Sequence, residues 1–289
     1  MPRSPHDSDY LHQQYLPSMT VPDAEALLQD SARRSANVRK RLDGELNLPY
    51  GDSPGQVLDI FPGSSTDGPV FIFIHGGYWR ASHVTRSVYS HIAAPLVKAG
   101  ATVVMPDYDL CPDVRISDIS MQIQQMMRWV YHNIQSYRGD PNRIHVAGHS
   151  AGGQLTGMLM STDWGRYTMP ADLIKGTVML SGLFDIEPHR HTALQKDIRL
   201  TADEANAMSP LKQSPHYHGS SILAVGENEP DLFHWQSLQY AAYLRQHHIR
   251  AEYLSTPDDN HFTITDRLGR ASDALTKLVI RRLFAPAGS

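Results

Sequence analysis

The sequence has 289 residues, of which 41% are hydrophobic and 19% charged, so it is too apolar for a disordered chain. Its length suits one large domain or two small ones. Lys and Arg number 26 against 30 Asp and Glu, and this formal net charge of -4 supplies no broad basic surface for nucleic acid.

The sequence also argues against a secreted or membrane-bound protein. The single cysteine, Cys111, cannot form an internal disulfide or a Cys-based zinc cluster, and we expect it to be a small buried residue. The longest purely aliphatic and aromatic run, Val70–Ile74, is far shorter than the roughly 20 residues of a membrane helix. Residues 1–10 are polar and lack the apolar segment of a signal peptide. We therefore expect a cytoplasmic enzyme with no membrane association and a single domain over residues 1–289.

Residues 1–50 differ from the rest of the chain and predict a helical N-terminal arm packed on the main domain. A helical pattern runs from Pro22 to Leu42. Asp23 and Glu25 lie in its first turn, where negative charge favours the helix dipole, and Gly44 ends it.

From residue 57 onward, strand patterns alternate with helix patterns. The predicted strands span residues 57–61, 69–74, 102–105, 143–147, 176–180, 222–225 and 251–254, and the predicted helices span 87–99, 117–137, 151–160, 234–247 and 272–284. The helix at 117–137 is the most regular, with Ser117 as its expected N-cap and Gly139–Pro141 after its end.

This alternation predicts an α/β fold with a mostly parallel central sheet and helices on both faces. The main break in the rhythm lies between Ser181 and Ser220, in a segment rich in His and Pro. We expect this segment, 181–220, to be a short cap-like excursion over one end of the sheet.

The segment Gly148-His-Ser-Ala-Gly152 stands between a predicted strand and a predicted helix. Glycines on both sides permit a tight turn that lifts the hydroxyl of Ser150 above the sheet edge, with a helix N-terminus behind it. The pattern also arises by chance, and an ordinary glycine-rich turn would look the same, so the interpretation depends on the strand-turn-helix context. We interpret Ser150 as a catalytic nucleophile.

A second motif, His75-Gly-Gly-Tyr78, follows the buried strand 69–74. Acyl transfer develops negative charge on a carbonyl oxygen, and backbone N–H groups must face that oxygen. Glycines let the main chain approach it without a Cβ in the way. We expect the amides of Gly77, Tyr78 and Ala151 to form this oxyanion hole, with Asp107–Pro112 packed beneath it.

A base and an acid are expected downstream, since hydrolases with such a turn order their triad as serine, acid, histidine. Of the sixteen histidines, His261 lies in the loop between the last strand and the last helix, and we assign it as the general base. Three carboxylates after strand 222–225 compete for the acid: Glu227, Glu229 and Asp231. Glu229 is preferred because it falls three residues after the small residue that closes the strand, and Asp231 is the alternative.

The other histidines are expected at the surface or in pocket walls. His247 and His248 lie on a predicted helix, and the pairs His189/His191 and His216/His218 lie in the excursion. Their H-x-H spacing could bind a metal ion, but no carboxylate ligands accompany them, so no metal site is predicted.

Aromatic residues near these motifs could form a pocket for the acyl or leaving group, although each one could equally be a core residue. The candidates are Tyr78, Trp79, Phe184, Phe233 and Trp235. Trp79 and Phe184 are the predicted substrate contacts, with Tyr78 or Trp79 narrowing the acyl side and Phe184 roofing the leaving-group side.

These motifs resemble the α/β-hydrolase superfamily and, more narrowly, its arylformamidase (kynurenine formamidase) branch. The matching segments are His75–Trp79, Tyr108–Pro112, Gly148–Gly153, Ser181–Pro188, Phe233 with Gln236 and Ser237, and Asn260–Phe262. The discriminating piece is His-Gly-Gly-x-Trp, where the related hormone-sensitive-lipase group has His-Gly-Gly-Gly. The resemblance implies hydrolysis of N-formylkynurenine to kynurenine and formate with no cofactor. In one departure, Glu229 stands where eukaryotic relatives carry Asp.

The sequence thus predicts a serine hydrolase of small acyl amides or esters, arylformamidase-like in type, with a small-molecule substrate. Two alternatives stay open. One is a short-chain carboxylesterase with no role in tryptophan breakdown. The other is a catalytically silent binder, although a binder has no need of an intact nucleophile, base and oxyanion strand. The sequence leaves the oligomeric state open, a homodimer included.

Overall fold

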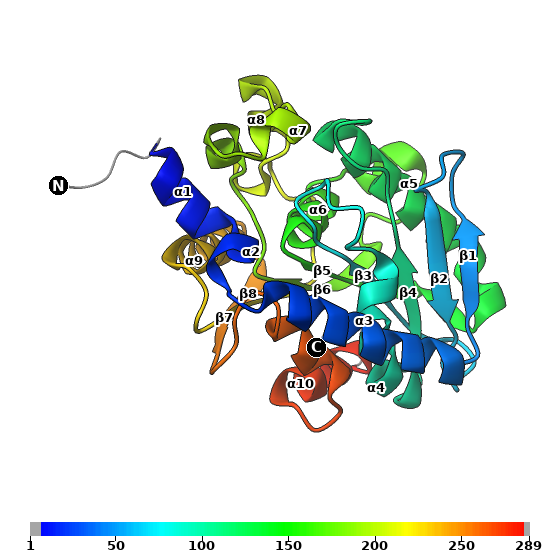
Figure 1. The fold of residues 1–289 in the computed structure, drawn as a ribbon. Helices are drawn as coiled ribbons and strands as arrows, with labels where there is room; N and C mark the ends of the chain where they lie inside the picture. The colour runs from blue at the N-terminus through cyan, green and yellow to red at the C-terminus, as the bar shows by residue number, and fades with distance from the viewer. Residues whose placement is uncertain (1–6, 286–289) are drawn as a thin grey trace.

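In the computed structural model, which describes residues 7–285, eight strands form one mixed sheet in the order β1-β2-β4-β3-β5-β6-β7-β8 (Figure 1). The strands are β1 (Glu45–Pro49), β2 (Val57–Phe61), β3 (Gly68–Ile74), β4 (Thr102–Pro106), β5 (Gly139–His149), β6 (Ile174–Leu180), β7 (Ser220–Gly226) and β8 (Arg250–Thr256). β2 pairs antiparallel with both β1 and β4, and every other neighbouring pair is parallel. The sheet is therefore mostly parallel, as the alternating pattern predicted.

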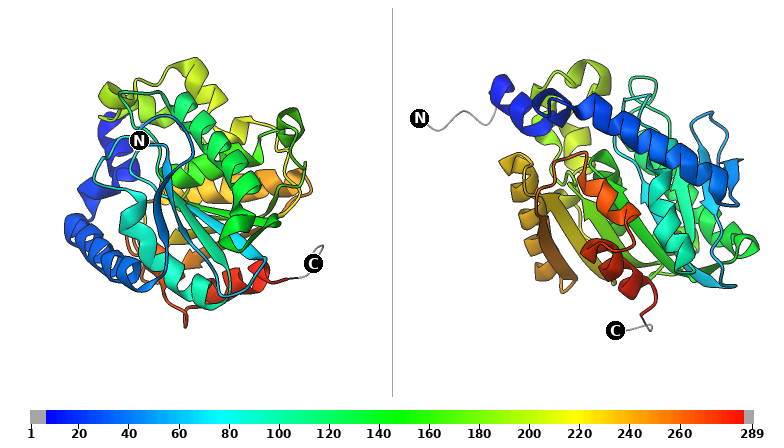
Figure 2. Two further views of the ribbon diagram at one scale, coloured as in Figure 1. Left: turned by 90° about the vertical axis from the view of Figure 1, so that its right-hand side faces the viewer. Right: turned by 60° about the horizontal axis from the view of Figure 1, so that its bottom comes forward.

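Helices cover both faces of this sheet (Figures 1 and 2). One face carries α5 (Ile116–Asn133), α6 (Ala151–Met160) and α9 (Asp231–Gln246). The other face carries α4 (Ala93–Lys98), α10 (Ala274–Leu283) and two 3₁₀ segments, η1 (Arg86–Ile92) and η6 (Ile264–Gly269). The long helix α3 (Ala24–Arg41) packs across η1 on this second face. The molecule thus has the layered α/β architecture that the sequence predicted.

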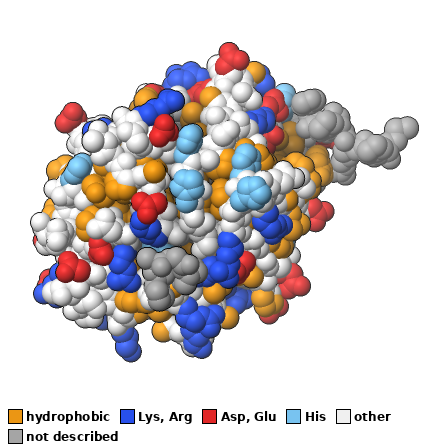
Figure 3. All heavy atoms as spheres, turned by 180° about the vertical axis from the view of Figure 1, so that it is seen from behind, with side chains coloured by type: hydrophobic (Ala, Val, Ile, Leu, Met, Phe, Trp, Pro, Cys, Tyr) orange, Lys and Arg blue, Asp and Glu red, His pale blue; other side chains and the backbone are white. Residues whose placement is uncertain are grey.

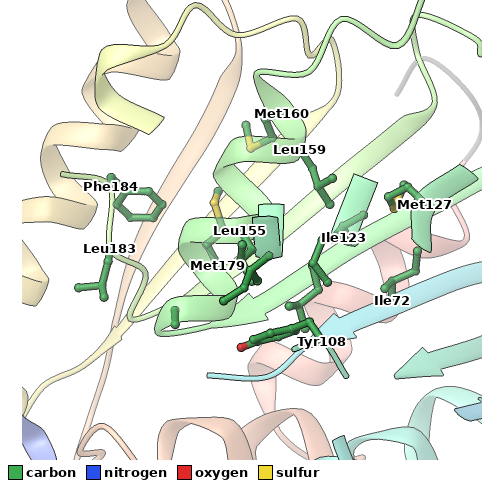
Figure 4. Packing of buried hydrophobic residues seen from close by; sticks show 14 of the residues in the cluster. Ile72, Tyr108, Ile123, Met127, Leu155, Leu159, Met160, Met179, Leu183 and Phe184 are labelled. Atoms are coloured by element: carbon green, nitrogen blue, oxygen red, sulfur yellow. The ribbon is translucent and has the colours of Figure 1, made fainter. Parts of the chain in front are cut away.

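Strand β3 shows why both faces need a cover. All its residues are buried, and because strand side chains alternate, its apolar run has two faces to bury. Ile72 belongs to the core beneath α5 and α6, whereas Phe71 and Phe73 belong to the core on the opposite face. Figure 4 shows Ile72 in the first core together with Ile123 and Met127 of α5.

The N-terminal arm differs from the prediction at its end. Its helices α1 (Ser8–Tyr15), α2 (Pro17–Thr20) and α3 stop at Arg41, and Glu45–Pro49 pairs with β2 as an edge strand. Most side chains of β1 are exposed, and its apolar alternation is limited to Leu46 and Leu48, which is too short a pattern to distinguish it from the rest of the arm.

Two helix details also differ. Helix α5 begins at Ile116 and not at the predicted N-cap Ser117, because the Asp118 carboxylate accepts a hydrogen bond from the N–H of Arg115, 2.9 Å away. The Ser117 hydroxyl instead donates to Glu204 Oε1 at 3.0 Å. The helix predicted over residues 87–99 is a 3₁₀ helix in its first half, and α4 forms only its second half.

The excursion leaves the sheet at the end of β6 and returns at the start of β7. It contains α7 (Gln195–Ile198), α8 (Ala202–Ala207) and the 3₁₀ turns η4 (Glu187–His191) and η5 (Pro210–Lys212). In Figure 1 the excursion and α1 lie over the same end of the molecule, and α1 contacts both η4 and α9. These segments therefore lie over the carboxyl ends of the parallel strands.

Charged side chains of both signs are spread over the face seen from behind (Figure 3). A cleft of about 790 Å³ at the amino ends of β5–β8 is lined by four cations, Arg143, Lys175, Arg250 and Arg282. Arg250 and Arg282 both pair with Glu252, and Lys175 pairs with Asp172, so two carboxylates compensate half of this positive charge. In the described part of the chain, no helix is both long and apolar enough to span a membrane.

A buried charge network fastens α3 to the sheet. Asp59 on β2 is fully buried, and its carboxylate oxygens contact the guanidinium groups of Arg39 on α3 and Arg86 on η1. Asp59 Oδ1 also accepts a hydrogen bond from the N–H of Asn47, 2.9 Å away. One carboxylate therefore joins the arm, the helical face and the edge strand.

We expect Asp59→Ala to lower the free energy of unfolding by about 3 kcal/mol, because the buried Arg86 and the partly buried Arg39 lose a carboxylate partner. Urea denaturation measures this change. The control is Asp30→Ala on the outer side of α3, where the carboxylate pairs with Arg33 and Arg34 near the surface and should contribute less than about 1 kcal/mol. Equal losses in the two variants would contradict this account of the arm.

Candidate active site

Ser150 occupies the sharp turn between β5 and α6. Its backbone has φ 55° and ψ −118°, a strained conformation that costs of order 1–3 kcal/mol and persists only when the surroundings impose it. The Ser150 N–H donates to the carbonyl of Leu180 at the end of β6, at 2.9 Å. Its own carbonyl accepts from the N–H groups of Gly153 and Gln154. These bonds hold the turn in place at the sheet edge.

Glycines make this turn sterically feasible. A Cβ at Gly148 would lie 2.1 Å from the carbonyl oxygen of Gly152, and a Cβ at Gly152 would lie 2.1 Å from that of Ile74 on β3. A Cβ at Gly76 would lie 3.0 Å from the Cβ of Ser150. The backbones of β3, β5 and α6 thus approach each other closely, and Ser150 lies directly beside the loop that follows β3.

His261 and Glu229 form a buried hydrogen-bonded pair, with 2.7 Å between His261 Nδ1 and Glu229 Oε2. The other carboxylate oxygen, Oε1, accepts from the Ser181 hydroxyl at 2.5 Å and from the Gly226 N–H at 2.7 Å. Three hydrogen bonds therefore fix the orientation of this carboxylate. The alternative acid, Asp231, is exposed in the first turn of α9. The structure brings Glu229, and not Asp231, to His261.

Ser181 is a site residue that the sequence analysis left within the excursion. It directly follows β6, has a positive φ of 49°, and donates its N–H to the carbonyl of Ala224 at 2.8 Å. Its hydroxyl then reaches Glu229. The available signal was its position at the carboxyl end of a parallel strand, the same position that singled out Ser150.

The loop after β3 turns sharply beside Ser150. Gly77, Tyr78 and Trp79 have consecutive positive φ values of 108°, 56° and 58°. The loop is held by the N–H of Cys111, which donates to the Trp79 carbonyl at 2.8 Å. Among the described residues, no backbone acceptor binds the N–H groups of Gly77, Tyr78 or Ala151. These three predicted oxyanion donors are therefore free to bind an oxygen of a substrate.

His75 supports this loop from beneath. Its ring stacks on that of Tyr108 with 4.5 Å between centroids, and its Nε2 lies 3.1 Å from Asp107 Oδ1. The Tyr108 hydroxyl donates to the His75 carbonyl at 2.9 Å. Burial opposes ionisation of Asp107, but His75 and Arg86 together hold the pKa of this carboxyl below its ordinary value. Segment 107–112 thus lies under the loop, as predicted.

The two predicted substrate contacts, Trp79 and Phe184, lie in the core of this structure. Both side chains are fully buried. The Trp79 indole N–H donates to Gln154 Oε1 at 3.0 Å, and the Phe184 ring stacks on Tyr240 with 4.2 Å between centroids. These neighbours account for the burial of both side chains, and contact of either one with a substrate stays a prediction.

Other aromatic candidates divide between the site and the surface. The ring of Phe233 is buried and lies 4.7 Å from that of His261, centroid to centroid. Trp235, two residues along α9, is 49% exposed and lies away from the site. Tyr78 is half-buried, and its hydroxyl bonds to the Ser18 hydroxyl of α2 at 3.2 Å. Of these candidates, only Phe233 touches a predicted triad residue.

The arm and the excursion close over this end of the sheet. The rings of Tyr15 on α1 and His189 on η4 lie 4.7 Å apart, and the Ala193 N–H donates to His12 Nε2 at 2.7 Å. Burial lowers the pKa of His189 to about 4, so this imidazole is neutral at pH 7. Beneath this cover Ser150 is only 3% exposed. Ser150 is therefore largely shielded from solvent in this structure.

Comparison with known proteins agrees with this geometry. A family model described as the alpha/beta hydrolase fold matches residues 71–265. Kynurenine formamidase of Danio rerio is 30% identical and aligns over 95% of this chain and 96% of its own length. The Salmo salar enzyme of that name is also 30% identical, over 89% of this chain and 86% of its own. A solved structure from Silicibacter sp. TM1040, provisionally assigned as a thioesterase, superposes with a TM-score of 0.80 at 28% identity, over 90% of this chain and 94% of that one.

No group of three or more His, Cys, Asp or Glu side chains within residues 7–285 is arranged to hold a metal ion. Of the H-x-H pairs, His189 is buried between Tyr15 and Trp79, with ring centroids 4.7 and 5.6 Å away. The geometry of the described residues therefore offers a serine, a histidine and a carboxylate as its chemical groups at this end of the sheet.

The two candidate acids can be separated by amide substitutions. We expect Glu229→Gln to lower kcat by about 10³–10⁴-fold, because an amide no longer holds His261 in the tautomer with Nδ1 protonated. Asp231→Asn, at the exposed start of α9, is the matched control and should stay within about twofold, as is usual for surface changes. Steady-state hydrolysis of a short aryl ester measures both, and the reverse order of effects would assign the acid to Asp231.

Proposed function

Since this chain belongs to the α/β-hydrolase family, and within it to the group that contains the kynurenine formamidases, we propose that it is an arylformamidase that hydrolyses N-formylkynurenine to kynurenine and formate. The observation that carries the proposal is the buried bond between His261 Nδ1 and Glu229 Oε2, on the same sheet edge as the strained turn of Ser150. Identity of 30% along nearly the whole chain supports the choice of substrate class.

The first half of the reaction forms a formyl-enzyme. Ser150 Oγ attacks the formyl carbonyl, and His261 accepts its proton on Nε2, because Nδ1 carries the proton that is donated to Glu229. Glu229 stabilises the resulting imidazolium through the same bond. The amides of Gly77, Tyr78 and Ala151 donate to the oxygen that becomes negative. Collapse of the tetrahedral intermediate breaks the C–N bond, and His261 returns the proton to the departing nitrogen.

The second half releases formate. A water molecule gives a proton to His261 Nε2 as it attacks the formyl ester of Ser150, and the same amides stabilise the second intermediate. Breakage of the ester bond frees formate, and His261 reprotonates Ser150. The chain's own side chains thus supply every proton transfer, so the proposed chemistry needs no cofactor. An aryl amine leaves more readily than an alkyl amine, which suits a formanilide.

The enclosed geometry supports a small acyl group. Ser150 and His261 are 3% and 4% exposed, and Gly76 approaches the Ser150 side chain to contact distance. Formyl, with no carbon beyond the carbonyl, needs the least space in such a site. A short-chain ester also fits this description, which makes a carboxylesterase the alternative that the substrate test must separate.

A cytoplasmic location is part of the proposal. Cys111 is buried and free, and it is the one cysteine of the sequence, so the fold does not depend on an oxidising compartment. Burial raises the pKa of this thiol to about 11, so it is not a reactive thiolate.

The substrate class is tested by comparing kcat/KM for N-formylkynurenine, formanilide and p-nitrophenyl esters of increasing acyl length. We expect N-formylkynurenine to be the best substrate. Among the esters, kcat/KM should fall steeply beyond about four carbons, since each excluded methylene shifts discrimination by roughly 1–3 kcal/mol. A preference for the acetyl ester over N-formylkynurenine would favour the carboxylesterase, and a maximum at eight carbons or more would refute the small-acyl site.

The nucleophile is tested with Ser150→Ala. Turnover should fall by more than about 10⁴-fold, because the loss of one triad member removes the covalent route. Ser161→Ala at the other end of α6, where the hydroxyl donates to the Gly157 carbonyl at 3.2 Å, should keep wild-type turnover. A fluorophosphonate should label Ser150 in the wild type. Near wild-type activity in a folded Ser150→Ala protein would refute the serine mechanism.

A further inference from the structure

His149 ends β5 and directly precedes Ser150, and it contacts the loop that carries His261. It is buried, with 3% of its surface exposed. Its Nε2 lies 2.9 Å from the carbonyl oxygen of His261, 112 residues away in the sequence. The two imidazole rings lie 4.6 Å apart, centroid to centroid. A side chain adjacent to the proposed nucleophile thus binds the main chain of the proposed base.

The acceptor of this bond determines the protonation of His149. A carbonyl accepts only, so Nε2 must carry the proton of the neutral ring. Within residues 7–285 Nδ1 has no hydrogen-bond partner, which agrees with an unprotonated nitrogen there. Burial, and after it the proximity of His261, hold the pKa of His149 well below its ordinary value. His149 is therefore a neutral donor beside the imidazole that becomes charged during the reaction.

The ring of His149 has little freedom to move. On one side, a Cβ at Gly76 would lie 3.3 Å from its Nδ1, so the oxyanion loop is at contact distance. On another side, the ring of Tyr89 lies 6.2 Å away, centroid to centroid. Its backbone is paired with Leu180 in the middle of the parallel sheet. The donor therefore stands on a rigid strand.

His261 itself lies on a loop and is held at two points. Its side chain is bound by Glu229, which follows β7, and its main chain is bound by His149 of β5. With the side-chain bond alone, the ring could pivot about the Nδ1–Oε2 contact and carry Nε2 away from Ser150. A misplacement of about 1 Å in a catalytic group can cost on the order of 10²-fold in rate.

We propose that His149 is a positioning residue, whose Nε2–H bond to the carbonyl of His261 fixes the base relative to Ser150. His149 does not touch the substrate in this account, and acts through the loop that carries His261. The proposal rests on the proposed roles of Ser150 and His261 and not on the identity of the acyl substrate.

The test compares His149→Gln with His149→Asn. Glutamine places an amide N–H at about the reach of imidazole Nε2, whereas the shorter asparagine places it near Nδ1 and cannot reach the His261 carbonyl. With p-nitrophenyl acetate, we expect His149→Asn to lower kcat at least tenfold with KM within twofold of wild type. His149→Gln should restore kcat to within threefold of wild type. The rate of Ser150 labelling by a fluorophosphonate should follow kcat in both variants.

The matched control is His145→Asn, four residues earlier on β5. This imidazole also has a lowered pKa, about 4, through burial and the nearby Arg143 and Lys175, but it lines the cleft at the amino ends of the strands and not the candidate site. Its substitution should leave kcat unchanged. His149→Phe keeps a ring and removes the hydrogen-bond donor, so it should lose as much activity as His149→Asn. It takes the place of His149→Asn in the comparison if the asparagine variant does not fold.

Several results would overturn the proposal. These are wild-type kcat in folded His149→Asn or His149→Phe, equal losses in the asparagine and glutamine variants, an equal loss in the His145 control, or a higher KM at unchanged kcat. Absence of fluorophosphonate labelling at Ser150 in the wild type would instead refute the serine mechanism itself. A failure of N-formylkynurenine as substrate leaves the comparison intact, because the assay uses an acetyl ester.

Discussion

The site depends on the close approach of three backbone segments, β3, β5 and α6. At Gly148 and Gly152 a Cβ would lie 2.1 Å from a carbonyl oxygen of the neighbouring segment, so only glycine permits this packing. The approach forces Ser150 into its strained turn and brings it beside the glycine loop after β3. The proposed nucleophile and the proposed oxyanion donors are thus placed by one steric constraint, before any side-chain hydrogen bond is considered.

The polar groups around this turn are connected across the carboxyl ends of four neighbouring strands. Ser181 follows β6, Glu229 follows β7, His261 follows β8, and His149 ends β5. Each bonds to a group on another of these segments, so the orientation of His261, the proposed base, results from several hydrogen bonds at once. Buried polar groups are costly when unpaired, and a network of this kind therefore holds one geometry in preference to others.

The layers above this network limit what can react there. The arm contributes Tyr15 and the excursion contributes His189, and their tilted rings lie 4.7 Å apart, centroid to centroid. In the proposed mechanism, this enclosure limits the water around the reacting groups and strengthens the electrostatic interactions between them. The same packing buries Trp79, whose ring lies 5.6 Å from that of His189 of the excursion, centroid to centroid, while Phe184 of the excursion is buried against Tyr240 of α9.

The sequence alone determined the features that depend on local order. Helix α6 has the predicted bounds, and the positions of Ser150 and His261 follow from strand-turn-helix and strand-loop-helix patterns. Tertiary structure decided the features that depend on contacts between distant segments. It brought Glu229 and not Asp231 to His261, and it placed Ser181 and His149 within hydrogen-bond distance of this pair. It also decided the pairing of the edge strand β1 and the burial of Trp79. The physical reason is that hydrogen bonding and burial are set by neighbours across the sheet, up to 112 residues away for His149 and His261, and periodicity along the chain carries no record of them.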